Sequence, residues 1–172
     1  MAQKFSLYGD LSVQQNLDFF AGVYGLTGKS RKDAISQMIE TFGFADRLDV
    51  NAMGLPLGYK QRLALACAVM HEPDVLFLDE PTSGVDPRTR REFWTHINAM
   101  VANGVTIMVT THFLDEAEYC DRMALIYRSK MIASGSPDEL KDRARASGMM
   151  DPTLEDAFIA LVEQSDRERE AA

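Results

Sequence analysis

The chain has 172 residues, of which 46% are hydrophobic and 26% charged, values typical of globular proteins that exclude a collagen-like, coiled-coil or wholly disordered chain. Its net charge of -8 has the wrong sign for a protein that neutralises phosphate backbones, so we expect no nucleic-acid partner. No run reaches the roughly 18 apolar residues of a membrane span, and the first residues show no secretory signal. These features predict a cytoplasmic protein.

Three helices are predicted in the first half of the chain. Ser12 and Gln15 form a capping box, after which apolar residues recur at helical spacing as far as Gly25. A turn is expected over 27–30, and a second amphipathic helix then ends at Gly43. The third helix follows the Gly- and Pro-bearing segment before Tyr59 and runs to about His71.

The second half alternates strands with helices, which predicts an α/β fold with a parallel sheet. Three apolar runs are expected to be strands: 75–78, 105–109 and 123–127. The first run does not alternate with polar residues, as expected of a strand buried on both faces. Helices are expected at 87–103 (capped by Asp86), 114–119, 137–145 (capped by Ser136) and from Thr153 to Val162. The acidic tail beyond Gln164 is expected to fray.

Two adjacent carboxylates, Asp79 and Glu80, follow directly on the first strand. Ligands of parallel sheets bind at this carboxyl edge, and a Mg²⁺ ion held by Asp79 would offset the cost of placing a carboxylate beside an apolar strand. Glu80 could then orient or deprotonate a water, although an ordinary acidic turn is the alternative. His112 follows the second strand and would face the same edge if the two strands are neighbours. It could donate to a phosphate oxygen there, or be a structural histidine.

A third segment, 55–62, is a Gly-bearing turn that opens a helix. Such a turn leaves backbone N–H groups and the positive end of the helix dipole available to an anion. Many helices begin after Gly and Pro for conformational reasons alone, which is the alternative interpretation.

Together these segments resemble the nucleotide-binding subunits of ATP-binding cassette (ABC) transporters, in the family's own order, over about residues 1–140. The matching motifs are Gln3 for the Q-loop, 55–62 for the signature motif, 76–80 for the Walker B strand and its glutamate, 83–86 for the D-loop, and His112 for the switch histidine. Residues 151–158 resemble the tail of drug-exporter ATPases of the ABC-2 type.

The resemblance implies a P-loop NTPase-like fold, with a parallel sheet, helices on both of its faces and a helical subdomain at about 11–72. The ATPase domain would span 1–150, and 151–172 would form a carboxyl-terminal helix and acidic tail. ATP and Mg²⁺ are the implied cofactors, with Asp79 and Gln3 serving the metal, Glu80 as general base and His112 at the γ-phosphate. The implied nucleotide-binding residues are Gln3, Leu55, Gly58, Tyr59 and Asp86, the last acting across a dimer interface.

Two features depart from the family's pattern. No GxxxxGK[ST] sequence occurs, so we expect an amino-terminally truncated domain that lacks the Walker A strand and loop and hydrolyses ATP negligibly by itself. The missing strand should leave either a gap or a weakened pairing between the strands at 105–109 and 123–127. In the signature, Pro56 and Leu57 replace the usual Ser and Gly, and Tyr59 replaces Gln, which weakens the expected closure over ATP.

The resulting interpretation is an ATPase subunit that couples ATP hydrolysis to export. Its implied partners are a second nucleotide-binding domain and a membrane permease, which would hold it at the inner face of the cell membrane. One alternative is a non-catalytic regulatory or dimer-partner module. Another is a soluble ABC-family ATPase without a membrane partner. ATP binding would distinguish the exporter subunit from the non-catalytic module. Co-purification with a membrane permease would distinguish it from the soluble ATPase.

Overall fold

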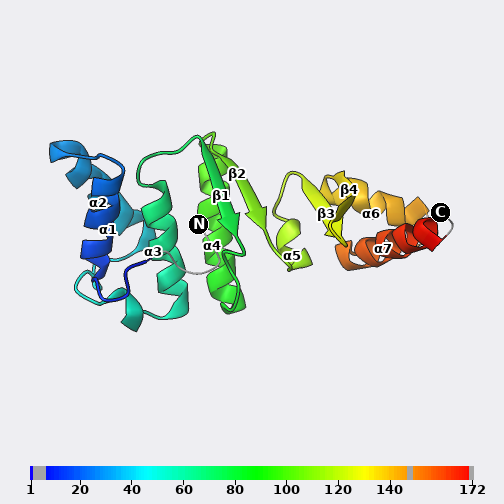
Figure 1. The fold of residues 1–172 in the computed structure, drawn as a ribbon, viewed down its shortest axis with the longest axis horizontal. Helices are drawn as coiled ribbons and strands as arrows, with labels where there is room; N and C mark the ends of the chain where they lie inside the picture. Colours follow the sequence, from blue (N-terminus) through cyan, green and yellow to red (C-terminus); the bar gives the residue numbers. More distant parts are fainter. Residues whose placement is uncertain (2–6, 147–148, 171–172) are drawn as a thin grey trace. The chain divides into compact units, whose positions relative to one another are not determined.

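The computed structural model describes Met1, residues 7–146 and residues 149–170. The chain divides into two compact units, Met1–Thr110 and Thr111–Ala172, whose elements are labelled in Figure 1. The first unit contains α1 (Val13–Val23), α2 (Gly28–Phe42), the 3₁₀ turn η1 (Ala52–Gly54), α3 (Leu57–Val69), β1 (Val75–Asp79), α4 (Pro87–Ala102) and β2 (Thr106–Thr110). The second contains α5 (Leu114–Ala117), β3 (Met123–Tyr127), β4 (Lys130–Gly135), α6 (Pro137–Ala146) and α7 (Leu154–Glu170).

Helices α1, α2 and α3 pack together, and their ends follow local signals in the sequence. The predicted capping box at Ser12 and Gln15 is confirmed, and Gly43 ends α2 in the left-handed conformation with φ 69°. The turn predicted over 27–30 is wrong, because α2 already begins at Gly28 behind an extended Thr27. The hydroxyl of Ser30 donates to the Thr27 carbonyl at 2.8 Å, which closes the first turn of the helix.

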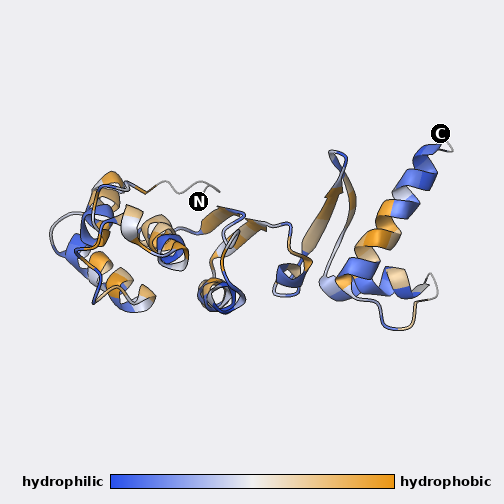
Figure 2. Cartoon of the chain, turned by 90° about the horizontal axis from the view of Figure 1, so that it is seen from below, coloured by the Kyte–Doolittle hydropathy of each residue, from blue (hydrophilic) through white to orange (hydrophobic). Residues whose placement is uncertain are grey.

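Strands β1 and β2 form a parallel pair, as predicted, with Val75 opposite Thr106 and Asp79 opposite Thr110. Leu76 and Leu78 are buried, but Val75 and Phe77 are 50% and 63% exposed, so the expected burial on both faces is wrong for these two residues. The reason is that α4 lies along one face of the pair (Figure 2), whereas Val75 and Phe77 remain at the surface.

The second unit is built on the antiparallel hairpin β3–β4, which packs with α6 and α7. Strand β4 was not predicted. The core of the second unit consists of Ala117, Leu125, Ala133, Leu140 and Leu154. Helix α7 continues to Glu170, so the expected fraying after Gln164 is wrong. Asp166 accepts a hydrogen bond from the Tyr127 hydroxyl at 3.2 Å and pairs with Arg128, which ties the end of this helix to the hairpin.

The two strand pairs are separate sheets, and within the described residues no pairing joins β2 to β3. The gap or weakened pairing predicted between these two strands concerns two different units and stays a prediction. None of the helices in the described residues is long and apolar enough to cross a membrane.

Candidate functional site

The carboxylates predicted at the end of the first strand lie beside the end of β2. Thr110 Oγ1 donates a hydrogen bond to Asp79 Oδ1 at 2.5 Å. The backbone N–H of Glu80 donates to both the carbonyl and the hydroxyl oxygen of Thr110, at 3.0 and 3.2 Å. These bonds lock the two strand ends together and hold the Asp79 carboxylate at the exposed carboxyl edge of the pair. Sequence reasoning did not single out Thr110, although hydroxyl residues at this strand end were the signal.

The backbone of Glu80 is in the left-handed region, with φ 42°. This conformation is unfavourable for an L-residue with a side chain, and residues held in it cluster at functional sites. The two hydrogen bonds from its N–H to Thr110 maintain it, and a tight turn follows, in which the N–H of Ser83 donates to the Glu80 carbonyl at 3.2 Å. The strand end therefore directs Glu80 away from the path of a regular strand.

The donor set at this edge fits Mg²⁺ only in combination with ligands from outside it. Asp79 supplies carboxylate oxygen, which is the donor that Mg²⁺ prefers, and one or two carboxylates plus phosphate oxygens are its usual ligands in nucleotide sites. Among the described residues no three His, Cys, Asp or Glu side chains gather into a metal cluster. Gln3, the other expected ligand, lies outside the described residues, although the neighbouring Met1 carbonyl accepts the N–H of Asp79 at 3.0 Å.

The signature-like segment and the D-loop-like segment lie side by side in the first unit. A hollow of about 380 Å³ is lined by Pro56, Leu57, Gly58, Tyr59, Arg62, Gly84, Val85, Asp86 and Thr89. Leu55, the remaining expected nucleotide contact, is buried and does not line it. Helix α3 begins at this hollow behind Pro56, which has no side-chain cap to offer. The first amides of α3 are therefore not capped by Pro56.

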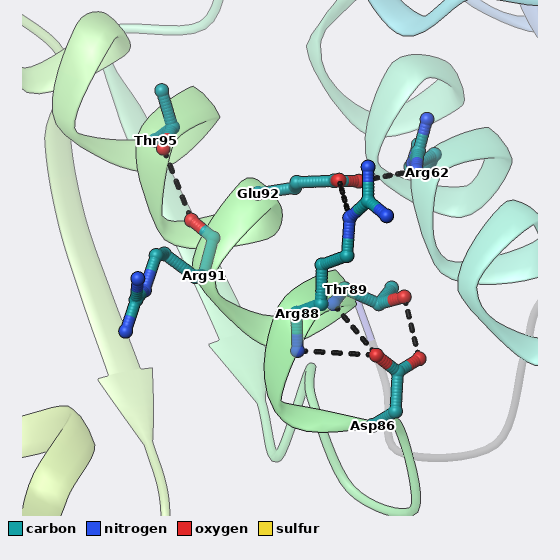
Figure 3. Close-up of polar contacts among 7 residues, drawn as sticks. All are labelled: Arg62, Asp86, Arg88, Thr89, Arg91, Glu92 and Thr95. Atoms are coloured by element: carbon teal, nitrogen blue, oxygen red, sulfur yellow. Dashed lines mark hydrogen bonds and ion pairs between the residues drawn. The ribbon is translucent and has the colours of Figure 1, made fainter.

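Asp86 is the N-cap of α4, as Figure 3 shows. Its Oδ1 accepts the N–H groups of Arg88 and Thr89, both at 3.1 Å, and its Oδ2 accepts the Thr89 hydroxyl at 2.6 Å. The hydroxyl and then the amide of Thr89 lower the pKa of Asp86. Both carboxylate oxygens thus hold the start of the helix.

Arg62 of α3 lines the hollow and contacts residues on both sides of it. Arg62 pairs with Glu92 of α4 at 2.7 Å, and the same carboxylate accepts from Arg88 at 3.2 Å (Figure 3). The guanidinium carbons of Arg47 and Arg62 lie 4.4 and 4.9 Å from the centre of the Tyr59 ring. Tyr59, which departs from the family pattern, therefore makes cation–π contacts with two arginines.

Gly58 is required by packing at this place. A Cβ atom added to it would lie 2.5 Å from the methyl carbon of Thr89, closer than van der Waals contact allows. The first turns of α3 and α4 approach each other through this pair. Sequence reasoning missed Thr89, because nothing local marks a residue that faces a glycine of another helix.

His112 belongs to the second unit. It is exposed, and its ring lies 4.1 Å from that of Phe113 with an interplanar angle of 37°. The prediction that it joins Asp79 and Glu80 at one edge stays a prediction, although β1 and β2 are neighbours, as that prediction requires.

A comparison with protein families matches residues 1–83 to the family described as ABC transporter. The probable multidrug ABC transporter ATP-binding protein YbhF of Escherichia coli is 64% identical over 168 residues, which are 98% of this chain and 29% of that protein. The Nod factor export ATP-binding protein I of Burkholderia orbicola is 38% identical over 132 residues, 76% of this chain and 43% of that one. The chain thus spans less than half the length of these relatives.

Two solved structures have the same fold. The structure of an ATP-binding subunit of an ABC transporter superposes with a TM-score of 0.77 at 27% sequence identity. The superposition covers 93% of this chain and 66% of the subunit. CbiO1 of Clostridium perfringens, described as part of the ABC transporter complex cbiONQ, gives a TM-score of 0.70 at 29% identity, over 82% of this chain and 58% of that one. The chain therefore has the mixed α/β fold that the resemblance implied, although α4 covers only one face of the β1–β2 pair.

Proposed function

We propose that the chain, which is similar to the ATP-binding proteins of ABC transporters, forms part of a subunit that couples ATP hydrolysis to export. The observation that carries the proposal is the carboxyl edge of β1 and β2, where Thr110 fixes the Asp79 carboxylate and the backbone of Glu80. An Asp79 carboxylate held by a hydrogen bond, followed by a Glu80 backbone held at a positive φ, suits a nucleotide site better than a solvated acidic turn.

Asp79 is the proposed Mg²⁺ ligand, with Gln3 as the second. Thr110 occupies Oδ1 of Asp79 and so orients the carboxylate. When bound, the ion supplies positive charge to the phosphates of ATP. The metal and the nucleotide would bind together, because the described residues at this edge supply too few ligands for a metal alone.

Glu80 is the proposed general base and His112 the proposed γ-phosphate contact. Glu80 accepts a proton from a water whose oxygen attacks the γ-phosphorus, and the bond to the bridging oxygen of ADP breaks. The hollow at Gly58 and Tyr59 is proposed to contact the nucleotide of a second ABC domain, with Leu55 buried beneath it. Since its carboxylate caps α4, Asp86 contributes there by holding the turn.

A membrane permease is the proposed second partner, which places the protein at the cytoplasmic face of the membrane. Helix α1 and the segment before it carry partly exposed aromatic residues suited to such a contact. The rings of Tyr8 and Phe19 are 4.6 Å apart, and Phe20 joins them at 5.4 Å from Phe19. Tyr8 and Phe19 are 49% and 40% exposed.

The test is ATP hydrolysis by a full-length version with a complete ATPase domain, purified from membranes together with its permease. Glu80→Gln should lower the turnover by about 10²- to 10⁴-fold, as expected for loss of a general base, and leave ATP binding intact. Glu40→Gln, which changes an exposed carboxylate of α2, is the matched control and should hydrolyse ATP at the wild-type rate. The chain by itself should hydrolyse ATP negligibly.

Two outcomes would decide for the alternatives. Unchanged hydrolysis in Glu80→Gln, or no hydrolysis in the wild-type complex, would favour a non-catalytic module. Pro56 gives that alternative its support, since it brings neither a hydroxyl nor an N–H to the signature turn. Hydrolysis without any co-purifying permease would favour a soluble ABC-family ATPase.

A further inference from the structure

Residues on both sides of His112 are joined by a closed set of hydrogen bonds within the second unit. Thr111 Oγ1 donates to Glu116 Oε2 at 2.7 Å, and the N–H of Phe113 donates to Thr111 Oγ1 at 3.1 Å. The N–H of Glu116 donates in turn to the Phe113 carbonyl at 3.2 Å. Three residues thus connect to one another around the histidine, and the carboxylate of Glu116 fixes the position of the Thr111 hydroxyl.

Glu116 is itself held in place by the core of the second unit. Its exposed fraction is 0%, although Asp115 beside it is exposed. A buried carboxylate is tolerated only where hydrogen bonds compensate the loss of water, so its bond with Thr111 is not readily exchanged for solvent. The next residue, Ala117, belongs to the core, and Leu114 packs against it. Helix α5 has only four residues, so stabilising this helix does not by itself explain the buried Glu116.

The imidazole of His112 is exposed but rests on Phe113. The ring centroids are 4.1 Å apart, so the imidazole packs against the Phe113 ring. The backbone of Phe113 is fixed by its two hydrogen bonds, one to Thr111 and one from Glu116. A continuous set of contacts therefore runs from the core through Glu116, Thr111 and Phe113 to the exposed histidine.

We infer that Glu116 is a positioning residue for His112, and that it acts as a buried hydrogen-bond acceptor which anchors the segment 111–113 to the core. The inference deepens the proposed function, because it concerns the histidine assigned there to the γ-phosphate. A phosphate contact on a freely moving loop would lose orientation each time the loop moved. The anchor through Thr111 and Phe113 removes that freedom before any nucleotide binds.

The test is NMR of the chain labelled only at histidine, in which His71 and His96 are internal references for the first unit. His112→Gln identifies the His112 signal. In Glu116→Ala the His112 signal should narrow and shift toward that of an unstructured histidine, while the other two signals stay in place. In a second, uniformly labelled sample, amide exchange at Phe113 should rise at least about tenfold, with exchange in α6 and α7 unchanged. Glu116→Gln keeps an acceptor oxygen and should restore both readouts. Glu155→Ala, which removes an exposed carboxylate of α7, is the control that should alter neither.

Three results would overturn the inference. These are an unmoved His112 signal in Glu116→Ala, a Glu116→Gln variant that behaves like Glu116→Ala, and faster exchange throughout α6 and α7, which would mark a merely structural residue. Should Glu116→Ala fail to fold, Thr111→Val against Thr111→Ser makes the same comparison, since only serine keeps the hydroxyl. The NMR readouts need no nucleotide, so a failure of the proposed ATP site would leave them unchanged and the two failures can be distinguished.

Discussion

Glu80 combines a proposed catalytic carboxylate with an unfavourable backbone conformation. Its φ of 42° is maintained by the bonds from its N–H to Thr110. The left-handed conformation costs an L-residue about 1–2 kcal/mol and costs glycine almost nothing. A glycine would therefore suit the backbone better, and a glutamate kept at this position agrees with the catalytic role proposed for its side chain.

This cost can be measured by comparing two variants that both lack the carboxylate. Glu80→Gly should raise the free energy of unfolding by about 1 kcal/mol over Glu80→Ala, because glycine adopts the positive φ without strain. Urea unfolding followed by the fluorescence of Trp94 is suitable, since this single tryptophan is buried in α4 of the first unit. At Thr95, an exposed position inside the same helix, the order should reverse, with glycine less stable than alanine by up to about 1 kcal/mol. Equal stabilities at Glu80 would show that no strain is stored there.

At the scale of elements, α3 and α4 meet through Gly58 and Thr89. The methyl carbon of Thr89 occupies the space that a Cβ on Gly58 would need, while its hydroxyl serves the N-cap Asp86. One side chain thus joins the packing of the signature-like turn to the capping of the D-loop-like segment. The glycine of the signature position is explained here by helix packing, whatever it contributes to nucleotide binding.

The packing role predicts a specific coupling between the two helices. Gly58→Ala should destabilise the first unit by about 1–3 kcal/mol through overpacking. Adding Thr89→Ser should recover most of that loss, because serine removes the methyl group and keeps the hydroxyl for Asp86. Trp94 fluorescence in urea measures all four members of the cycle. Gly22→Ala in α1, where a Cβ would meet no atom within 4 Å, should be neutral or stabilising. Additive effects of the two substitutions would contradict the packing role.

The sequence predicted those elements whose ends depend on neighbouring residues. The capping box at Ser12, the N-cap Asp86 and the left-handed Gly43 are local signals, and all three are confirmed. The extension of α7 was missed because it depends on Asp166, which meets the hairpin 39 residues away at Tyr127. Similarly, which residues of β1 are exposed depends on where helices pack against the strand, and the apolar run 75–78 does not reveal this.

The candidate site divides in the same way. Asp79 and Glu80 were predicted from a strand followed by two carboxylates, a pattern within one short segment. The hydrogen bond from Thr110 depends on the register of β1 with β2, and the contact of Gly58 with Thr89 depends on how two helices cross. The burial of Glu116 equally depends on the packing around it. These contacts are long-range or tertiary, so spacing along the chain does not reveal them.

For the molecule as a whole, the most consequential surface feature is an exposed apolar face on each sheet. Phe77 and Met108 are register partners on β1 and β2 and are 63% and 58% exposed. Ile126 and Met131 are partners in the hairpin and are 70% and 65% exposed. Paired large apolar side chains at the surface of a sheet are typical of interfaces or of aggregation-prone surfaces. The chain should therefore self-associate as its concentration rises.

Replacing one of these pairs should weaken that self-association without unfolding the chain. Phe77→Lys combined with Met108→Glu places opposite charges across the parallel strands and leaves the net charge unchanged, so a general charge effect is avoided. Removing two apolar side chains, each contributing about 1.5 kcal/mol or more on burial, should raise the concentration at the midpoint of association at least about tenfold. Sedimentation velocity across a concentration series measures this midpoint, and Trp94 fluorescence verifies that the first unit remains folded. Val101→Lys combined with Asn98→Glu, at exposed positions of α4, introduces the same charges away from the sheet and should leave the midpoint in place. If the two double variants shift it equally, or the unsubstituted chain sediments as a monomer at every concentration, the apolar sheet face does not drive association.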